Sequence, residues 1–296
     1  MTASPGHRFR GPLFMTIATG SYVVNDTMMK LATEGLPPYE TLTIRGIWAT
    51  LWGLPLLLLL GYGRKLPMIA DGRVLARNLC ETVAILCYVV ALANMPIADA
   101  TALGQVTPLL VILGAAFLLR ERIGGVRAAL IATGFLGALM VAQPTGAGIS
   151  IFALLALGNA IFCAVRDLVG RGVRAEVPGL IVAFSAAVVV LLGAASAHLL
   201  TESWVAPSAR HLTLLCAAGL FLMGGHFFLF SAYRVGSTHT VAPFYYTFTL
   251  WAMISGVLVF GHLPNRLALA GIVLVCASGL AVVLMDERRR RPVPAA

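Results

Sequence analysis

Residues 178–200 read PGLIVAFSAAVVVLLGAASAHLL and contain no lysine, arginine, aspartate or glutamate. The hydrocarbon core of a bilayer is about 30 Å thick, and a helix needs roughly 20 apolar residues to cross it. Backbone polar groups in lipid must be bonded within a helix or a closed barrel, and barrel strands are much shorter than this stretch. The stretch therefore predicts a transmembrane helix.

The rest of the chain repeats this pattern. Apolar windows cover residues 11–33, 40–62, 73–94, 96–119, 126–142, 149–169, 178–200, 211–233, 239–261 and 266–285. The segments between them are mostly short and collect proline, glycine and charge, which leaves no room for a soluble domain. We predict an all-α integral membrane protein with ten transmembrane helices.

The composition excludes several classes of protein. Of the 296 residues, 59% are hydrophobic and 11% are charged, and the mean hydropathy is +0.90. An average soluble domain is about 25% charged, so a soluble enzyme, a nucleic-acid binder and a disordered scaffold are excluded. The five cysteines lie in apolar windows without metal-ligand spacing, so we expect no disulfides and no metal. The sequence contains no nucleotide-binding or hydrolase motif, so we expect no cofactor and no enzymatic activity.

The net charge of +9 is distributed in a way that predicts topology. With a cytoplasmic N-terminus, 17 of the 21 lysines and arginines fall on the cytoplasmic side, and only Arg210 and Arg266 fall outside. This bias follows the positive-inside rule and indicates a membrane protein with both termini in the cytoplasm. Residues 1–10 then form a cytoplasmic N-terminus, and residues 287–296 form a cytoplasmic basic tail. Charges scattered over short loops do not form a nucleic-acid surface.

The chain also divides into two halves, residues 11–145 and 146–286, at an offset of about 140. Ala102 and Thr107 correspond in this way to Ala242 and Thr247. Five helices in each half is an odd number, so the halves must enter the membrane from opposite sides. Inverted repeats place a substrate site near the midplane and support alternating access between the two sides.

Three stretches carry a family resemblance. Residues 88–103, YVVALANMPIADATAL, lead into Thr107 and are similar to helices 3 and 4 of EamA-type carriers of the drug/metabolite transporter superfamily. Residues 43–49 resemble that family's helix 2 with its arginine, and residues 242–264 resemble its helix 9. His262 stands where the family has an acidic residue.

The resemblance implies ten helices in a bacterial inner membrane and export or exchange of small metabolites. Some bacterial members export amino acids, aromatic ones among them, and others resemble importers of adenosyl-methionine or riboflavin. Plant and protozoan relatives move sugar phosphates and nucleotide sugars. A central cavity lined by helices 1, 3, 4, 6, 8 and 9 is implied in the same way.

Charged residues inside the windows are costly in lipid and need a reason. We expect one ionic cluster near the outer face, formed by Asp26, Lys30, Arg45 and Asp99. At the inner end of the sixth helix the repeat places Arg166 and Asp167, and near the third helix's inner start Glu81 follows Arg77 by one turn. These groups are either gates that open and close or static ion pairs, and Glu81 is also a candidate proton or cation site.

A mixed polar and aromatic set is expected to line the cavity: Tyr22, Asn25, Tyr88, Thr101, Gln105, Asn159, His226, Tyr245, Tyr246 and Trp251. Buried tyrosine hydroxyls need partners, which favours such a position, although His226 equally fits a packing residue. The set suits an amphipathic metabolite such as an amino acid and lacks a central clamp for phosphate esters. Pro108 and Pro243 are predicted hinges in the fourth helix of each half.

These observations favour a secondary carrier whose partners are a small-molecule substrate and the lipid bilayer. The small residues of the fifth and tenth helices suit close packing or a dimer face, so the protein is expected to be a monomer or a homodimer. An intramembrane enzyme acting on lipid would require acidic, histidine or serine residues gathered at one depth, whereas the acidic residues here are spread over both faces. A scaffold or receptor would not require polar groups in the middle of the membrane.

Overall fold

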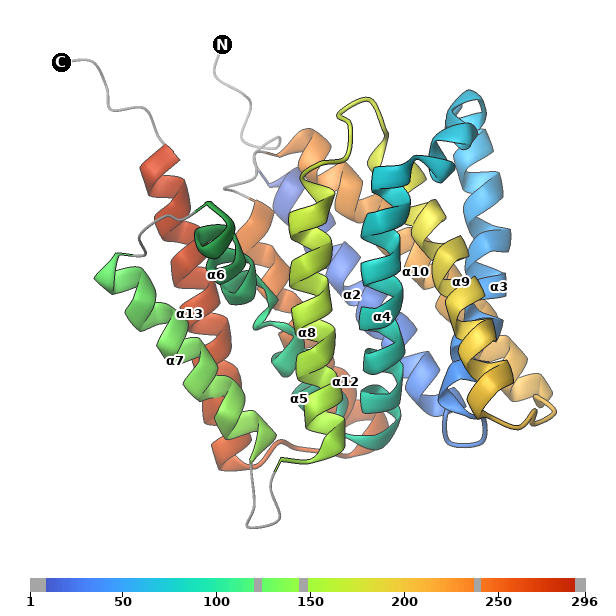
Figure 1. The fold of residues 1–296 in the computed structure, drawn as a ribbon. Coiled ribbons are helices and arrows are strands. Elements are labelled where there is room, and N and C mark those ends of the chain that lie inside the picture. The colour runs from blue at the N-terminus through green and yellow to red at the C-terminus, as the bar shows by residue number, and fades with distance from the viewer. Residues whose placement is uncertain (1–8, 120–123, 144–148, 237–240, 291–296) are drawn as a thin grey trace.

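The structure is a computed structural model, and it describes residues 9–119, 124–143, 149–236 and 241–290. Within these ranges the chain forms helices and turns and no strand. The helices run side by side in one bundle (Figure 1). The predicted all-α class is confirmed.

The elements follow the apolar windows closely. Their bounds are α2 (Arg10–Ala32), α3 (Pro38–Leu59), η1 (Gly63–Ala70), α4 (Gly72–Asn94), α5 (Ile97–Gly104), α6 (Thr107–Leu119), α7 (Gly125–Ala142), α8 (Ile151–Gly170), α9 (Gly179–Thr201), α10 (Ala209–Val235), η2 (Ala242–Tyr246), α12 (Thr247–Phe260) and α13 (Arg266–Arg290). In the described ranges, nine spans are long and apolar enough to cross a membrane, with α5 and α6 taken together and η2 taken with α12. The remaining long helix, α2, has 23 residues and carries Asp26 and Lys30.

Two windows predicted as continuous helices are broken. The window 96–119 divides into α5 and α6, with turns at Gln105 and Val106, so Pro108 lies at the start of a helix and not in the middle of one. The described part of the window 239–261 begins with the 3₁₀ helix η2, which contains Pro243. Proline lacks an N–H and its ring clashes with the preceding turn, so a helix more readily starts at proline than passes through it.

The helix contacts repeat between the two halves. The helix α2 packs against α10 as α4 packs against α8, and α3 packs against α10 as α9 packs against α4. The helix α12 contacts α2 as α6 contacts α8, whereas α3 pairs with α9 and α7 pairs with α13. In Figure 1 the pairs α3–α9 and α7–α13 lie at opposite edges, with α2, α4 and α8 between them.

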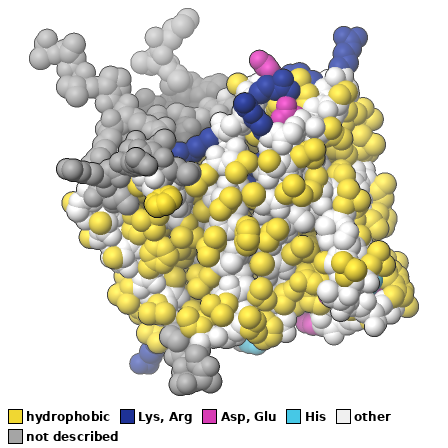
Figure 2. All heavy atoms as spheres, viewed as in Figure 1, with side chains coloured by type: hydrophobic (Ala, Val, Ile, Leu, Met, Phe, Trp, Pro, Cys, Tyr) yellow, Lys and Arg dark blue, Asp and Glu magenta, His cyan; other side chains and the backbone are white. Residues whose placement is uncertain are grey.

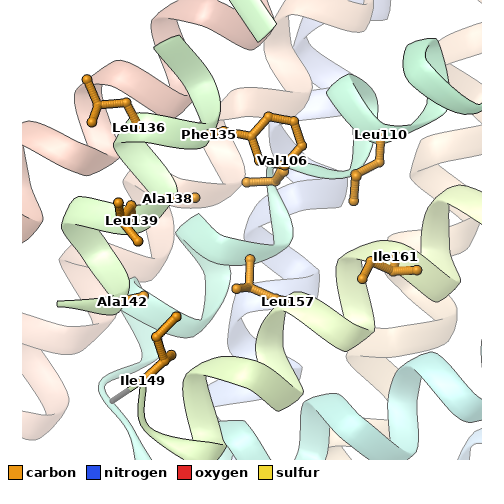
Figure 3. A pocket seen from close by; sticks show the side chains of 10 residues that line it. All are labelled: Val106, Leu110, Phe135, Leu136, Ala138, Leu139, Ala142, Ile149, Leu157 and Ile161. Carbon is orange, nitrogen blue, oxygen red and sulfur yellow. The ribbon is translucent and has the colours of Figure 1, made fainter. Parts of the chain in front are cut away.

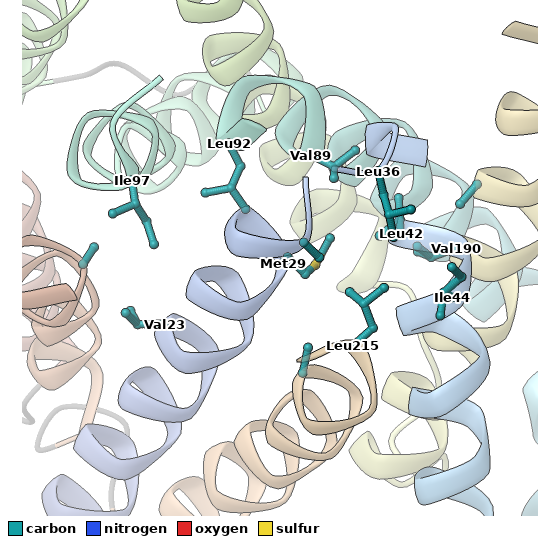
Figure 4. Packing of buried hydrophobic residues seen from close by; sticks show 14 residues of the cluster. Val23, Met29, Leu36, Leu42, Ile44, Val89, Leu92, Ile97, Val190 and Leu215 are labelled. Carbon is teal, nitrogen blue, oxygen red and sulfur yellow. The ribbon is translucent and has the colours of Figure 1, made fainter. Parts of the chain in front are cut away.

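Buried apolar side chains hold the central helices together. Met29 of α2, Leu42 of α3, Val89 and Leu92 of α4 and Leu215 of α10 meet in one cluster (Figure 4). Each is at most 4% exposed. Burial of such side chains fixes the relative positions of these helices close to where Asp26 and Arg45 lie.

Charge is concentrated at the ends of the bundle. In Figure 2 the visible flank is mostly hydrophobic, and most of the visible lysine and arginine side chains lie along its upper edge. Asp71 joins two segments of this side: its Oδ2 lies 2.6 Å from Nη2 of Arg174, and its Oδ1 accepts hydrogen bonds from the N–H groups of Arg73 and Val74. At the other side, Glu202 accepts hydrogen bonds from the N–H groups of Tyr39 and Glu40, at 3.0 Å each. Asp71 therefore caps α4 and links it to the segment between α8 and α9, and Glu202 at the end of α9 caps α3.

We predict that substitution of Asp71 lowers the stability of the protein slightly and that the loss depends on pH. Desolvation raises the pKa of its carboxyl, but the two backbone hydrogen bonds and Arg174 outweigh it, so the pKa is lowered from the usual 3.8. A lowered pKa stabilises the fold above the usual value, and this stabilisation is lost as pH falls through the lowered one. We expect Asp71→Ala to melt slightly below the wild type at pH 7 in detergent, with Asp71→Asn between them because its amide oxygen still caps α4. Equal melting temperatures at pH 7 would contradict this.

Candidate functional site

A first polar layer lies where α2 and α4 meet. The Asp26 carboxylate accepts a hydrogen bond from Asn25 Nδ2 at 2.9 Å on one oxygen and from the Tyr88 hydroxyl at 2.8 Å on the other. Asp26 is 7% exposed and Asn25 is 4% exposed. Arg45 of α3 is 6% exposed and interacts with Asp26 electrostatically. The cavity candidates Asn25 and Tyr88 thus contact a residue predicted as part of a gate.

Lys30 bonds to backbone carbonyl oxygens and not to the acidic side chains with which it was predicted to cluster. Its Nζ donates to the carbonyl oxygens of Leu92 at 2.6 Å and Met95 at 2.8 Å, and lies 5.6 Å from the centre of the Phe260 ring. The last carbonyls of a helix have no partner within the helix, so the end of α4 offers acceptors to a cation.

The expected four-residue ionic cluster is therefore not formed. Among the described residues, no pair of Asp26, Lys30, Arg45 and Asp99 lies within 4.0 Å as an ion pair. Asp99 lies in the first turn of α5, and its buried Oδ1 has no hydrogen-bond partner in the described part of the chain. The four residues share one end of the bundle without pairing, and only Asp26 and Lys30 find hydrogen bonds there, from amide, hydroxyl and backbone groups in place of opposite charges.

A second charged layer joins α4 and α8. Glu81 of α4 lies 2.5 Å from Arg77 Nη1 and 3.1 Å from Arg166 Nη1 of α8. Arg166 also contacts Asp167 at 2.8 Å. The side chains of Glu81, Arg77 and Arg166 are 14–20% exposed, so this cluster is largely buried. The structure brings together residues that the sequence placed in two separate pairs.

The two layers are separated by about two turns of α4. Tyr88 follows Glu81 by seven residues, which is about 10 Å along a helix axis. The space between them is aromatic. The Tyr22 hydroxyl lies 2.9 Å from Nδ1 of His226, and the Tyr22 ring centre is 6.5 Å from that of Phe248. Tyr245 stacks on Phe248 at 6.3 Å with an interplanar angle of 5°.

The other predicted cavity residues do not join this aromatic set. The Tyr246 side chain points at Gly279 of α13, and its hydroxyl is buried without a hydrogen-bond partner in the described residues. Trp251 donates from Nε1 to the Thr16 carbonyl at 3.2 Å. Gln105 donates to the Thr249 hydroxyl at 3.3 Å.

Two further predicted residues, Thr101 and Asn159, lie on α5 and α8. Thr101 is 2% exposed and Asn159 is 8% exposed. Asn159 Oδ1 accepts a long contact of 3.5 Å from Cys163 Sγ on its own helix. The two helices that carry these residues contact each other.

Hydroxyl pairs between α2 and the η2–α12 region were missed. The Thr27 and Ser255 hydroxyls are 2.6 Å apart, and the Thr19 and Thr247 hydroxyls are 2.7 Å apart. Asn78 of α4, which is fully buried, donates to Ser185 of α9 at 2.9 Å. The only signal in the sequence is that these small polar residues stand inside apolar windows, which does not identify their partners.

Two surface grooves lie away from the charged layers. One, of about 440 Å³, is lined only by apolar side chains of α6, α7 and α8 and the segments beside them, including Phe135, Leu139 and Leu157 (Figure 3). The other, of about 470 Å³, runs along α2 and α12 beside Trp251 and Ser255. Apolar grooves on the flank of a membrane protein suit lipid chains, so neither is the candidate site.

Comparison with known proteins identifies the relatives of this chain. Residues 9–143 match the model of the EamA-like transporter family. A riboflavin transporter of Rhizobium johnstonii is 28% identical over 98% of this chain and 96% of its own length. The pseudopaline exporter CntI of Pseudomonas aeruginosa is 30% identical over 92% of this chain and 95% of its own length. One solved crystal structure shares the fold with a TM-score of 0.64 and 18% identity, over 98% of this chain and all of its own.

Proposed function

The chain belongs to the EamA-like transporter family, and from this premise we propose that it exports small metabolites, amino acids first among them, by alternating access. The family resemblance predicted from the sequence is confirmed, and with it a multi-pass membrane transporter. The solute, the direction of transport and the mechanism are our proposal. We place the protein in the inner membrane of a bacterium.

Alternating access requires two halves that move against each other, and we assign them to residues 11–145 and 146–286 as inverted repeats. The exchange of helix contacts between the halves supports this assignment, because contacts of α2 with α10 and of α4 with α8 are equivalent under it. The carboxylates of Asp71 and Glu202 support it as well, because Asp71, between α3 and α4, pairs with Arg174 between α8 and α9, whereas Glu202, between α9 and α10, bonds to the start of α3. Both termini are cytoplasmic in this proposal.

The observation that carries the proposal is the pair of charged layers about 10 Å apart with an aromatic region between them. The layer of Glu81 and Arg166 bridges α4 and α8, which belong to different halves, so it acts as the inner gate. The layer of Asp26 and Tyr88 lies at the opposite end. A solute with an apolar body and polar ends fits between the layers.

Hinges at the broken helices allow the gates to open. The turns at Gln105 and Val106 precede Pro108, and the 3₁₀ helix η2 contains Pro243. Backbone that is not α-helical bends at lower cost than a continuous helix. We propose that these two breaks change angle when the halves move.

Transport by the purified protein in liposomes tests the proposal. The panel contains radiolabelled amino acids, adenosyl-methionine, riboflavin and sugar phosphates. We expect exchange of aromatic amino acids above that of empty liposomes. If no solute in the panel moves, the proposed function is wrong.

Riboflavin transport is the second candidate. The relative from Rhizobium johnstonii carries that name, and the stacked rings of Tyr245 and Phe248 offer a surface for a flat ring system. The same panel distinguishes the two candidate functions, because it contains riboflavin, which carries no carboxylate, beside amino acids, which carry one. Movement of riboflavin without movement of any amino acid would favour this alternative.

A further inference from the structure

Arg45 is a buried cation to which the fold supplies no direct partner. It is 6% exposed, and its Nε is fully buried without a hydrogen bond. Among the described residues, no hydrogen bond or ion pair involves its guanidinium. A guanidinium has five N–H donors, and burying them without acceptors is unfavourable. The guanidinium of such a residue is available to bind a hydrogen-bond acceptor from outside the chain.

The groups around Arg45 are already engaged. It lies on α3, which packs against α2, α4, α9 and α10, and its charged or titratable neighbours are Asp26, Glu81 and His226. The oxygens of Asp26 accept from Asn25 and Tyr88. The Glu81 carboxylate faces the two other arginines, and His226 is bonded to the Tyr22 hydroxyl. Asp26 and Glu81 offset the charge of Arg45 at a distance, and none of the three neighbours bonds to its donors.

The position of Arg45 suits contact with a solute. It follows the first residue of α3 by seven residues, about 10 Å along the axis, and Asp26 precedes the last residue of α2 by six. Both residues therefore lie at a similar depth from the same side of the bundle. Lys30, which follows Asp26 by one turn of α2, is occupied by two carbonyl oxygens and is not free to bind a solute.

We propose that Arg45 binds the carboxylate of the transported solute. The planar fork of a guanidinium matches the two oxygens of a carboxylate, which a lysine ammonium does not. Asp26 then remains as the nearest anion for an ammonium group, as in an α-amino acid. This inference rests on the proposed transport function and narrows its substrates to metabolites that carry a carboxylate.

The test compares one acid with its amide in the wild type, Arg45→Lys, Arg45→Gln and Arg64→Gln. Phenylalanine and phenylalaninamide share the ring and the ammonium group and differ in the carboxylate. Arg64 is exposed on η1 and has no partner in the described residues, so Arg64→Gln removes the same charge elsewhere. The two readouts are competition with tracer exchange in liposomes and the melting shift of detergent-purified protein on adding each compound.

We expect the wild type and Arg64→Gln to prefer the acid over the amide. Loss of a charge-assisted hydrogen bond typically weakens binding by about tenfold to a hundredfold. Arg45→Lys should therefore lose about tenfold of the preference, and Arg45→Gln should lose all of it. A merely structural role would lower the binding of both compounds together and leave their ratio unchanged.

Three results overturn the inference. One is a wild type that does not distinguish acid from amide in either readout, or that moves riboflavin alone. Another is an unchanged acid-to-amide ratio in Arg45→Lys. The third is a ratio in Arg64→Gln that falls as far as in Arg45→Gln, since this would be a general effect of charge. Failure of the transport proposal is recognised separately, because the wild type would then move no solute in the panel at all.

Discussion

Replacing Glu81 by glutamine is expected to destabilise the protein by about 3 kcal/mol and to impair transport. Glu81 is the only acidic partner that Arg77 has in the described residues, and it also pairs with Arg166 of α8. Without it, two largely buried arginines would face each other with less compensation. Removing one member of a buried ion pair typically costs about 3–5 kcal/mol, and partial exposure places this case at the lower end. The melting temperature in detergent and exchange in liposomes measure the two effects.

The double variant Glu81→Gln/Arg77→Gln is the control for this prediction. It restores the net charge of the cluster and removes the arginine that has lost its acidic partner, while Arg166 keeps Asp167, so it should recover most of the lost stability. Transport should stay impaired, because the link between α4 and α8 is still missing. Wild-type melting of Glu81→Gln would show that the cluster contributes nothing to the fold.

Replacing Gly271 by alanine is expected to destabilise the protein by about 1–3 kcal/mol. A Cβ atom on Gly271 would lie 2.5 Å from the carbonyl oxygen of Gly137, and one on Gly137 would lie 2.7 Å from the carbonyl oxygen of Gly271. Both obstacles are backbone atoms, which cannot rotate away. The helices α7 and α13 would have to separate, with loss of the close contact that small residues allow. The melting temperature in detergent measures the change.

Gly224→Ala provides a matched control, for which we expect no loss of stability or a small gain. Gly224 also lies inside a long helix, α10, but a Cβ atom there would meet nothing within 4 Å. Alanine is favoured over glycine in a helix by about 1 kcal/mol, so this variant should be neutral or slightly more stable. If both variants shifted the melting temperature equally, the contact of α7 with α13 would not be the reason.

Hydropathy predicts the helices well because lipid imposes the same requirement on each of them. The window 178–200 corresponds to α9 at Gly179–Thr201 almost residue for residue. The break between α5 and α6 was not predicted, since residues 105–106 are no less compatible with a helix than their neighbours. Pro108 indicates some irregularity there, but a proline can kink a continuous helix or start a new one, and tertiary packing decides between the two.

The candidate site was predictable in its residue types and not in its pairings. The pairing of Glu81 with Arg166 depends on the packing of α4 against α8, which no spacing encodes. The partners of Lys30 are backbone carbonyls, and these have no signature in a sequence. Tyr245 and Tyr246 are adjacent, yet one faces Phe248 and the other faces Gly279, because their directions depend on the η2 turn.

The polar content of α2 has a consequence for biosynthesis. Asp26 leaves the ribosome 62 residues ahead of Tyr88, and Lys30 leaves it 62 and 65 residues ahead of Leu92 and Met95. A charged residue near the middle of a lone helix raises the free energy of insertion by up to about 3 kcal/mol. The first helix therefore enters the bilayer before the hydrogen-bond partners of Asp26 and Lys30 in and beside α4 have been synthesised. We expect nascent chains that stop before α4 to hold this helix poorly in the membrane, and chains that include α4 to hold it firmly.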